Sequence, residues 1–177
     1  MKHKPRMARH AGSIGPQTTP GLPTANPGLA RFDIFVGGWD ITGRLRGSTE
    51  DDISGWANFE WMPGGFFLEH RSETNLRGVS MFSFEMIGYD PATQKFMSRV
   101  YTSMDETPQL AEWDVQGRTV SIRAQGMQFT GEISADGNSV TGGWAPCDDT
   151  GSQELSYDAV MTRAGPRVVS GSDALLN

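Results

Sequence analysis

The chain has 177 residues, enough for one domain with a sizeable core, and its formal net charge is −6. Residues 1–28 are basic and contain no acidic residue, so the remainder is strongly acidic, which argues against a nucleic-acid partner. The 22 glycines, 10 prolines and 37% apolar content favour many short strands over long helices, and no apolar run is long enough to span a membrane.

Few residues in this sequence are suited to metal or redox chemistry. Cys147 is the only cysteine, so no internal disulfide is expected. His70 is the only histidine outside the N-terminal tail, and a zinc site of His and Cys ligands is therefore not supported. No phosphate-binding glycine loop and no dinucleotide motif occurs, so we expect no metal and no cofactor. The start of the chain lacks a secretory signal, which predicts a cytoplasmic location.

The two ends of the chain differ in composition from the segment between them. Residues 1–28 are rich in Pro, Gly, Thr and Ala and offer too little apolar surface to offset the entropy of ordering, so they are predicted to be a disordered tail. Residues 29–36 are mostly apolar and fit a short helical turn that closes one end of a barrel. Residues 164–177 are rich in Gly and Ser and predict a second flexible tail, which leaves one domain over residues 29–163.

The first strands are indicated by apolar residues that recur with a period of two. One such strand begins at Trp39, and a second covers residues 53–61. It ends at residues 63–65, where a proline and two glycines predict a hairpin turn. The strand after that turn places Leu68 and His70 together on its apolar face.

The rest of the chain predicts further short strands separated by turns, over residues 79–89, 95–103, 109–115, 118–124, 127–135, 139–145 and 153–163. The strand over 79–89 is apolar on both faces, so its pattern does not fix which face is buried. About ten strands at short, even spacing, with no helix-length segment between them, predict an all-β fold. We expect a closed antiparallel up-and-down β-barrel, because closure removes the exposed edges of so long a sheet.

Several short motifs together resemble the uncharacterised bacterial family known as DUF1579, and they lie at residues 32–40, 60–68, 87–91, 136–138, 142–144 and 161–163. The resemblance spans about residues 29–163 and implies a calycin-like barrel, similar in plan to lipocalins, fatty-acid-binding proteins and nitrobindins. It implies no established activity. A Gly-x-Trp at the first strand recurs across calycins, where the Trp packs at the closed end, so Trp39 is interpreted mainly as structural. Haem bound as in nitrobindins is not supported, because no histidine follows His70.

The candidate ligand-binding residues are the aromatic and neighbouring side chains of the predicted barrel: Trp39, Phe59, Trp61, Leu68, His70, Phe84, Tyr101, Trp113 and Trp144. Ligand pockets have mostly apolar walls with a few placed polar groups, which His70 and Tyr101 would supply. Glu69 is adjacent to His70, but neighbouring side chains of a strand point to opposite faces, so the two are not expected to share one pocket.

Three interpretations of the barrel remain open. The first is a protein that binds a small apolar or aromatic molecule, and we rank it highest. The second is a filled barrel with a structural role only. The third is an enzyme such as an isomerase, cyclase or decarboxylase, which would need a titratable pair across the lumen, His70 with Arg99 or Glu85. We rank it lowest, because Glu85, Arg99 and Glu112 are residues that more often face solvent, and we assign no catalytic residue. The oligomeric state is left open, with a homodimer as one option.

Overall fold

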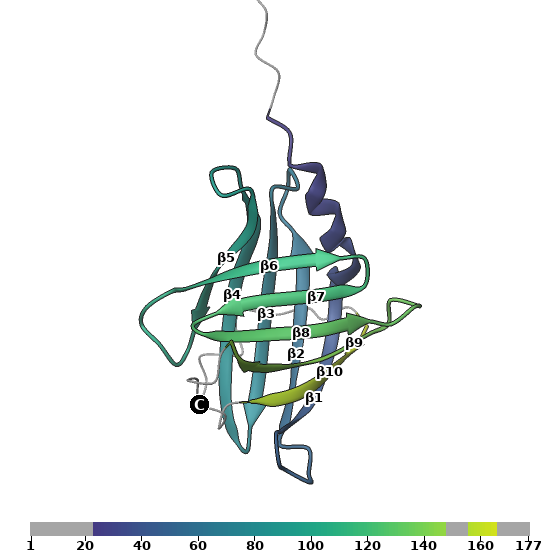
Figure 1. The fold of residues 1–177 in the computed structure, drawn as a ribbon, viewed down its shortest axis with the longest axis vertical. Helices are drawn as coiled ribbons and strands as arrows, with labels where there is room; N and C mark the ends of the chain where they lie inside the picture. Colours follow the sequence, from purple (N-terminus) through teal and green to yellow (C-terminus); the bar gives the residue numbers. More distant parts are fainter. Residues whose placement is uncertain (1–22, 148–155, 166–177) are drawn as a thin grey trace, which may run out of the picture.

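In the computed structural model of this protein, the described residues are 23–147 and 156–165. They form one 3₁₀ helix, η1 (Pro27–Phe35), and ten strands (Figure 1). The strands are β1 (Gly37–Leu45), β2 (Ile53–Trp61), β3 (Phe67–Leu76), β4 (Val79–Asp90), β5 (Lys95–Thr102), β6 (Gln109–Gln116), β7 (Thr119–Ala124), β8 (Met127–Ile133), β9 (Ser139–Pro146) and β10 (Tyr157–Arg163).

The strands form one closed barrel in which each strand pairs antiparallel with its neighbours in sequence, and β1 pairs with β10. In Figure 1, β1 to β4 run along the long axis and β6 to β9 cross in front of them. The closing register runs from Trp39 opposite Arg163 to Leu45 opposite Tyr157. The predicted closed up-and-down barrel of about ten strands is therefore confirmed.

Helix η1 closes one end of the barrel. Leu29, Phe32 and Phe35 are its buried residues, and they belong to the same core cluster as Trp39. The Trp39 indole Nε1 donates to the carbonyl oxygen of Phe35 at 2.7 Å, and the Arg163 guanidinium carbon lies 4.2 Å from the centre of the Trp39 ring. Arg163 also donates to the carbonyl oxygens of Ile34 and Val36, at 2.6 and 2.8 Å. These bonds connect η1 to the last strand.

The predicted helical turn is confirmed, although it begins at Pro27 rather than at residue 29. Asn26 explains the earlier start, because its side-chain oxygen accepts a hydrogen bond from the Gly28 backbone at 2.8 Å, and a proline follows at the first helical position. The tails predicted over 1–28 and 164–177 fall mostly outside the described residues. The strand predicted over 153–163 begins, as described, at Tyr157, and residues 148–155 also lie outside.

The structure fixes the phase of β4, the strand whose sequence pattern is apolar on both faces. Met81, Ser83 and Glu85 line the interior of the barrel, whereas Phe82 is 47% exposed on the outer face. The pairing of β4 with β3 sets this phase. His70 lies directly opposite Glu85 in the hairpin, so the two side chains point to the same face of the sheet. Among the described residues, no helix has the length and apolar character needed to cross a bilayer.

Candidate functional site

The barrel encloses a cavity of about 460 Å³ between η1 and the opposite end. Its walls are built mainly from apolar side chains that alternate inward along the strands, among them Ile41, Ile53, Val100, Ile122, Val140 and Met161. Binding pockets for small molecules have volumes of roughly 300–1,000 Å³ and walls of this kind. The cavity is therefore large enough for a small organic molecule.

Aromatic rings form the floor of this cavity, next to η1. Phe35 reaches the floor from η1 itself and packs against Phe59 of β2 and Trp113 of β6, with ring centres 5.6 and 6.0 Å away. The His70 imidazole lies parallel to the Phe59 ring, with centres 4.1 Å apart and planes inclined by 1°. His70 is thus fixed in a stacked position at the edge of an apolar surface.

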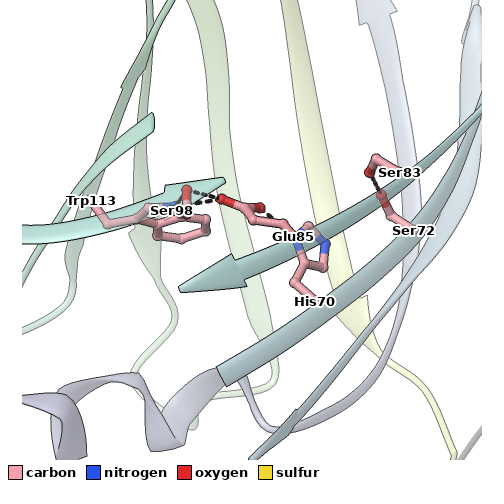
Figure 2. Close-up of polar contacts among 6 residues, drawn as sticks. All are labelled: His70, Ser72, Ser83, Glu85, Ser98 and Trp113. Atoms are coloured by element: carbon pink, nitrogen blue, oxygen red, sulfur yellow. Dashed lines mark hydrogen bonds and ion pairs between the residues drawn. The ribbon is translucent and has the colours of Figure 1, made fainter. Parts of the chain in front are cut away.

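His70 and Glu85 form an ionisable pair at the floor. The two residues lie opposite each other on β3 and β4, and His70 Nδ1 is 2.8 Å from Glu85 Oε2 (Figure 2). The other oxygen, Glu85 Oε1, accepts from the Ser98 hydroxyl at 2.5 Å and from the Trp113 indole at 2.8 Å. Three donors from three strands therefore hold this carboxyl group. We call His70 and Glu85 the dyad.

The environment of Glu85 keeps it ionised although the side chain is buried. Burial acts to raise the pKa of the carboxyl group, but the hydrogen bond and charge of His70, with hydrogen bonds from Ser98 and Trp113, outweigh it. The pKa of Glu85 is therefore held below its ordinary value of 4.5. At neutral pH this carboxylate only accepts hydrogen bonds, so the Nδ1 atom of His70 must be the donor.

The second imidazole nitrogen, Nε2, is the polar atom that the dyad presents to the cavity. Within residues 23–147 and 156–165, no side-chain nitrogen or oxygen is buried without a hydrogen-bond partner, and Nε2 has no protein partner there. The atom is therefore accessible from the cavity, which His70 lines. A dyad of this kind fixes the tautomer of the imidazole and can orient either a ligand or a proton transfer.

Further polar groups line the wall above the dyad. The hydroxyls of Ser72 and Ser83 bond each other at 2.6 Å, next to His70 and Glu85 on the same two strands (Figure 2). Tyr157 lines the cavity from β10, and burial raises the pKa of its phenol to about 12. Tyr157 therefore stays neutral at physiological pH. Among the described residues, no three His, Cys, Asp or Glu side chains gather closely enough to hold a metal ion.

The structure places four of the nine sequence-predicted site residues on the cavity: Phe59, His70, Trp113 and Trp144. Trp39 and Leu68 are fully buried in the core cluster but do not line the cavity. The indole of Trp61 donates to the Asp33 carboxylate at 2.8 Å, outside the lumen. These three residues stabilise the closed end.

The lumen positions expected for Phe84 and Tyr101 are wrong. Both lie on the outer face, where their ring centres are 6.4 Å apart and the Arg71 guanidinium carbon is 5.2 Å from the Phe84 ring centre. Tyr101 is 46% exposed. The reason is the phase of β4 and β5: Glu85 and Val100 point inward, so the paired neighbours Phe84 and Tyr101 must point outward.

Glu85 is the candidate site residue that the sequence pattern did not assign to the cavity. Of the three charges considered for the lumen, Glu85 is 5% exposed inside, while Arg99 is exposed and Glu112 pairs with Lys95 at 2.8 Å. The signal lay in the turn at Arg77-Gly78, because His70 and Glu85 are equally distant from it in sequence and pair across the hairpin. Glu69, as expected, faces away and bonds Arg71.

A family model described as a protein of unknown function, DUF1579, matches residues 29–142. The chain belongs to the DUF1579 family. The matched segment contains most of η1, the aromatic floor and the dyad of this DUF1579 chain, whereas Trp144 and Tyr157 lie beyond it. A comparison with curated proteins found no match. The family description assigns no activity to the chain.

Proposed function

We propose that this protein binds a small, largely apolar molecule in the barrel cavity. The observation that carries the proposal is a cavity of about 460 Å³ with mostly apolar walls and, among the described residues, one ionisable pair, the dyad, at its floor. Apolar walls supply affinity through burial, and a few polar atoms in fixed positions supply orientation.

The dyad supports this proposal because its geometry is fixed before a ligand arrives. Stacking on Phe59 and the hydrogen bond to Glu85 leave the imidazole little rotational freedom, so little entropy is lost in ordering this side chain on binding. The volume of the cavity favours binding over the filled-barrel alternative. Voids larger than a water molecule are few in packed protein interiors, and an empty one forfeits contacts.

We also propose that the protein has no nucleic-acid partner and that it is located in the cytoplasm. The acidic composition beyond residue 28 supports the first, and a single cysteine, Cys147, is compatible with a reducing compartment.

Titration with an uncharged naphthalene dye, N-phenyl-1-naphthylamine, tests binding in the cavity. We expect saturable enhancement of dye emission with a Kd of roughly 1 μM, about 8 kcal/mol, and quenching of tryptophan emission, since Trp113 and Trp144 line the cavity. Ala124→Phe, which adds volume inside the cavity, should weaken the dye, and Tyr101→Ala on the outer face should not. Unsaturable binding, or equal effects of both variants, would refute the proposal.

A second candidate function, proton transfer by the dyad, is favoured by one observation. A carboxylate fixes Nδ1 of His70 and leaves Nε2 facing the cavity, which is the arrangement of a general base. The test is deuterium exchange at the α-carbon of 2-tetralone in D₂O. Exchange faster than in buffer, and lost in His70→Phe, would support an isomerase-type activity. Exchange at the buffer rate would exclude it for this ketone.

A further inference from the structure

We infer that the cavity selects neutral molecules that present a hydroxyl group to His70, and that it rejects carboxylates. This inference rests on the proposed binding function and names the chemical class of the ligand. It follows from three properties of the site: the hydrogen-bonding character of the anchoring atom, the charge of the cavity lining, and the way the Glu85 oxygens are occupied.

The anchoring atom accepts hydrogen bonds when the imidazole is neutral. The ionised Glu85 has no proton to give, so the hydrogen bond of 2.8 Å requires the proton on Nδ1 of His70. Neutral imidazole carries one proton only, which leaves Nε2 as an acceptor. A ligand that reaches Nε2 must therefore donate, as an alcohol or a phenol does and a ketone does not.

The charge of the lining excludes anions. Glu85 and Asp105 line the cavity, and no Lys or Arg does so among the described residues. Arg71, next to the dyad in sequence, points outward onto Glu69 and Phe84, and the sequence has no basic residue between Arg123 and Arg163. Protonation of His70 would neutralise only Glu85, so in either state a bound carboxylate would add an uncompensated buried charge.

The occupied oxygens of Glu85 disfavour ammonium ligands. Oε1 accepts from Ser98 and Trp113, and Oε2 accepts from His70, so the carboxylate faces protein donors. A buried ammonium group would contact the uncharged Nε2 atom and not a carboxylate oxygen. It would also lose most of its hydration. A hydroxyl satisfies the same atom without that penalty.

Glu85→Gln should reverse the polarity of the anchor. The Trp113 indole N–H only donates, so the amide oxygen of the new side chain must occupy the Oε1 position. Its NH₂ group then faces His70 Nδ1, which becomes the acceptor, and the imidazole proton moves to Nε2. The variant should lose its preference for a hydroxyl and gain affinity for a ketone.

Four probes that share a naphthalene ring and differ in the end group test the inference: 2-naphthalenemethanol, 2-acetonaphthone, 2-naphthoate and 2-naphthylmethylamine. Competition with the uncharged dye is measured at pH 8.5, where histidine is ordinarily neutral. In the unmodified protein we expect the alcohol to bind at least about tenfold more tightly than each of the others. In Glu85→Gln we expect the ketone to gain about tenfold.

Glu69→Gln, on the outer face of the same strand, is the matched control and should leave the order of affinities unchanged. Equal or tighter binding of naphthoate or of the amine would overturn the inference, and so would a ketone that equals the alcohol. If neither the dye nor any probe binds, the result contradicts the proposed binding function itself.

A second measurement uses the unmodified protein and so does not depend on whether a variant folds. The ¹⁵N shifts of the His70 imidazole in the unmodified protein should show a protonated Nδ1 and an unprotonated Nε2 at pH 8.5, and the opposite tautomer would overturn the inference.

Discussion

Two buried tryptophans belong to the core cluster of the barrel, and their hydrogen bonds differ. Trp39, fully buried at the closed end, donates to a backbone carbonyl of η1. Trp113, 5% exposed at the floor of the cavity, donates to the Glu85 carboxylate. The bond of Trp39 joins β1 to η1, whereas the bond of Trp113 helps to hold the ionisable group of the dyad. Trp39 does not line the cavity and Trp113 does, so burial of an aromatic side chain alone does not separate a structural position from a position in the site.

Trp39→Ala should cause the largest loss of stability. It removes the side chain that joins η1, β1 and Arg163, and large-to-small changes of buried aromatics cost about 3–5 kcal/mol. The free energy of unfolding from urea titration measures the effect. A loss below about 1 kcal/mol would show that the closed end does not depend on this residue.

Glu85→Ala should destabilise the protein less, by about 2–3 kcal/mol. The change leaves His70, Ser98 and Trp113 without their common acceptor inside an apolar wall. The same urea titration applies, with Glu112→Ala as control. Glu112 forms a partly exposed pair with Lys95, so its loss should change stability by at most about 1 kcal/mol. Equal effects of the two changes would contradict the buried role of Glu85.

Acidification should remove the stabilisation that Glu85 provides. Because the pKa of Glu85 is lower in the folded protein than its ordinary value of 4.5, the folded state favours the ionised form. This contribution is complete above about pH 4.5 and is lost as the pH falls through the lower, folded-state pKa. Urea titrations between pH 3 and 7 should show a weaker dependence on pH in Glu85→Gln than in the unmodified protein. Parallel curves would contradict the assignment.

Phe84→Ala should have the smallest effect, about 0.5–1 kcal/mol, because it removes an outer-face contact with Arg71 and Tyr101. The affinity for the uncharged dye should stay within about twofold of the unmodified protein. A change of tenfold in dye affinity would show that the outer face, and not the cavity, binds the dye.

The fold could be predicted from the sequence because its signals are local. Alternation marked the strands, and Pro63-Gly64-Gly65 marked a turn whose two glycines adopt φ of 96° and 69°. The phase of β4 could not be predicted, because Phe82 and Phe84 on one face and Met81 and Ile87 on the other give the same apolar pattern.

The candidate site was predicted in part for the same reason. His70 was placed inward by alternation on its own strand, where Leu68 is fully buried. Glu85 depends on pairing between strands, and a charged residue in a strand ordinarily faces water. Only the symmetric position of the two residues about Arg77-Gly78 brings them together, and that relation is not visible within either strand alone.

The pairing of β1 with β10 has a consequence for how the protein folds. Each of the other strand pairs joins neighbours in sequence, but this pair joins the two ends of the barrel and closes the longest loop. Such a contact carries the largest loop-closure entropy, so we expect closure to be the slow, late step of folding.

Three cavity-lining residues, Tyr157, Ala159 and Met161, come from β10. The cavity therefore exists only after that step. A molecule bound in it stabilises the closed barrel by mass action, so ligand concentration and the lifetime of the closed state are linked. A cavity ligand should therefore lower mainly the rate at which the closed barrel unfolds. The rate at which the hairpins form before closure should be unchanged.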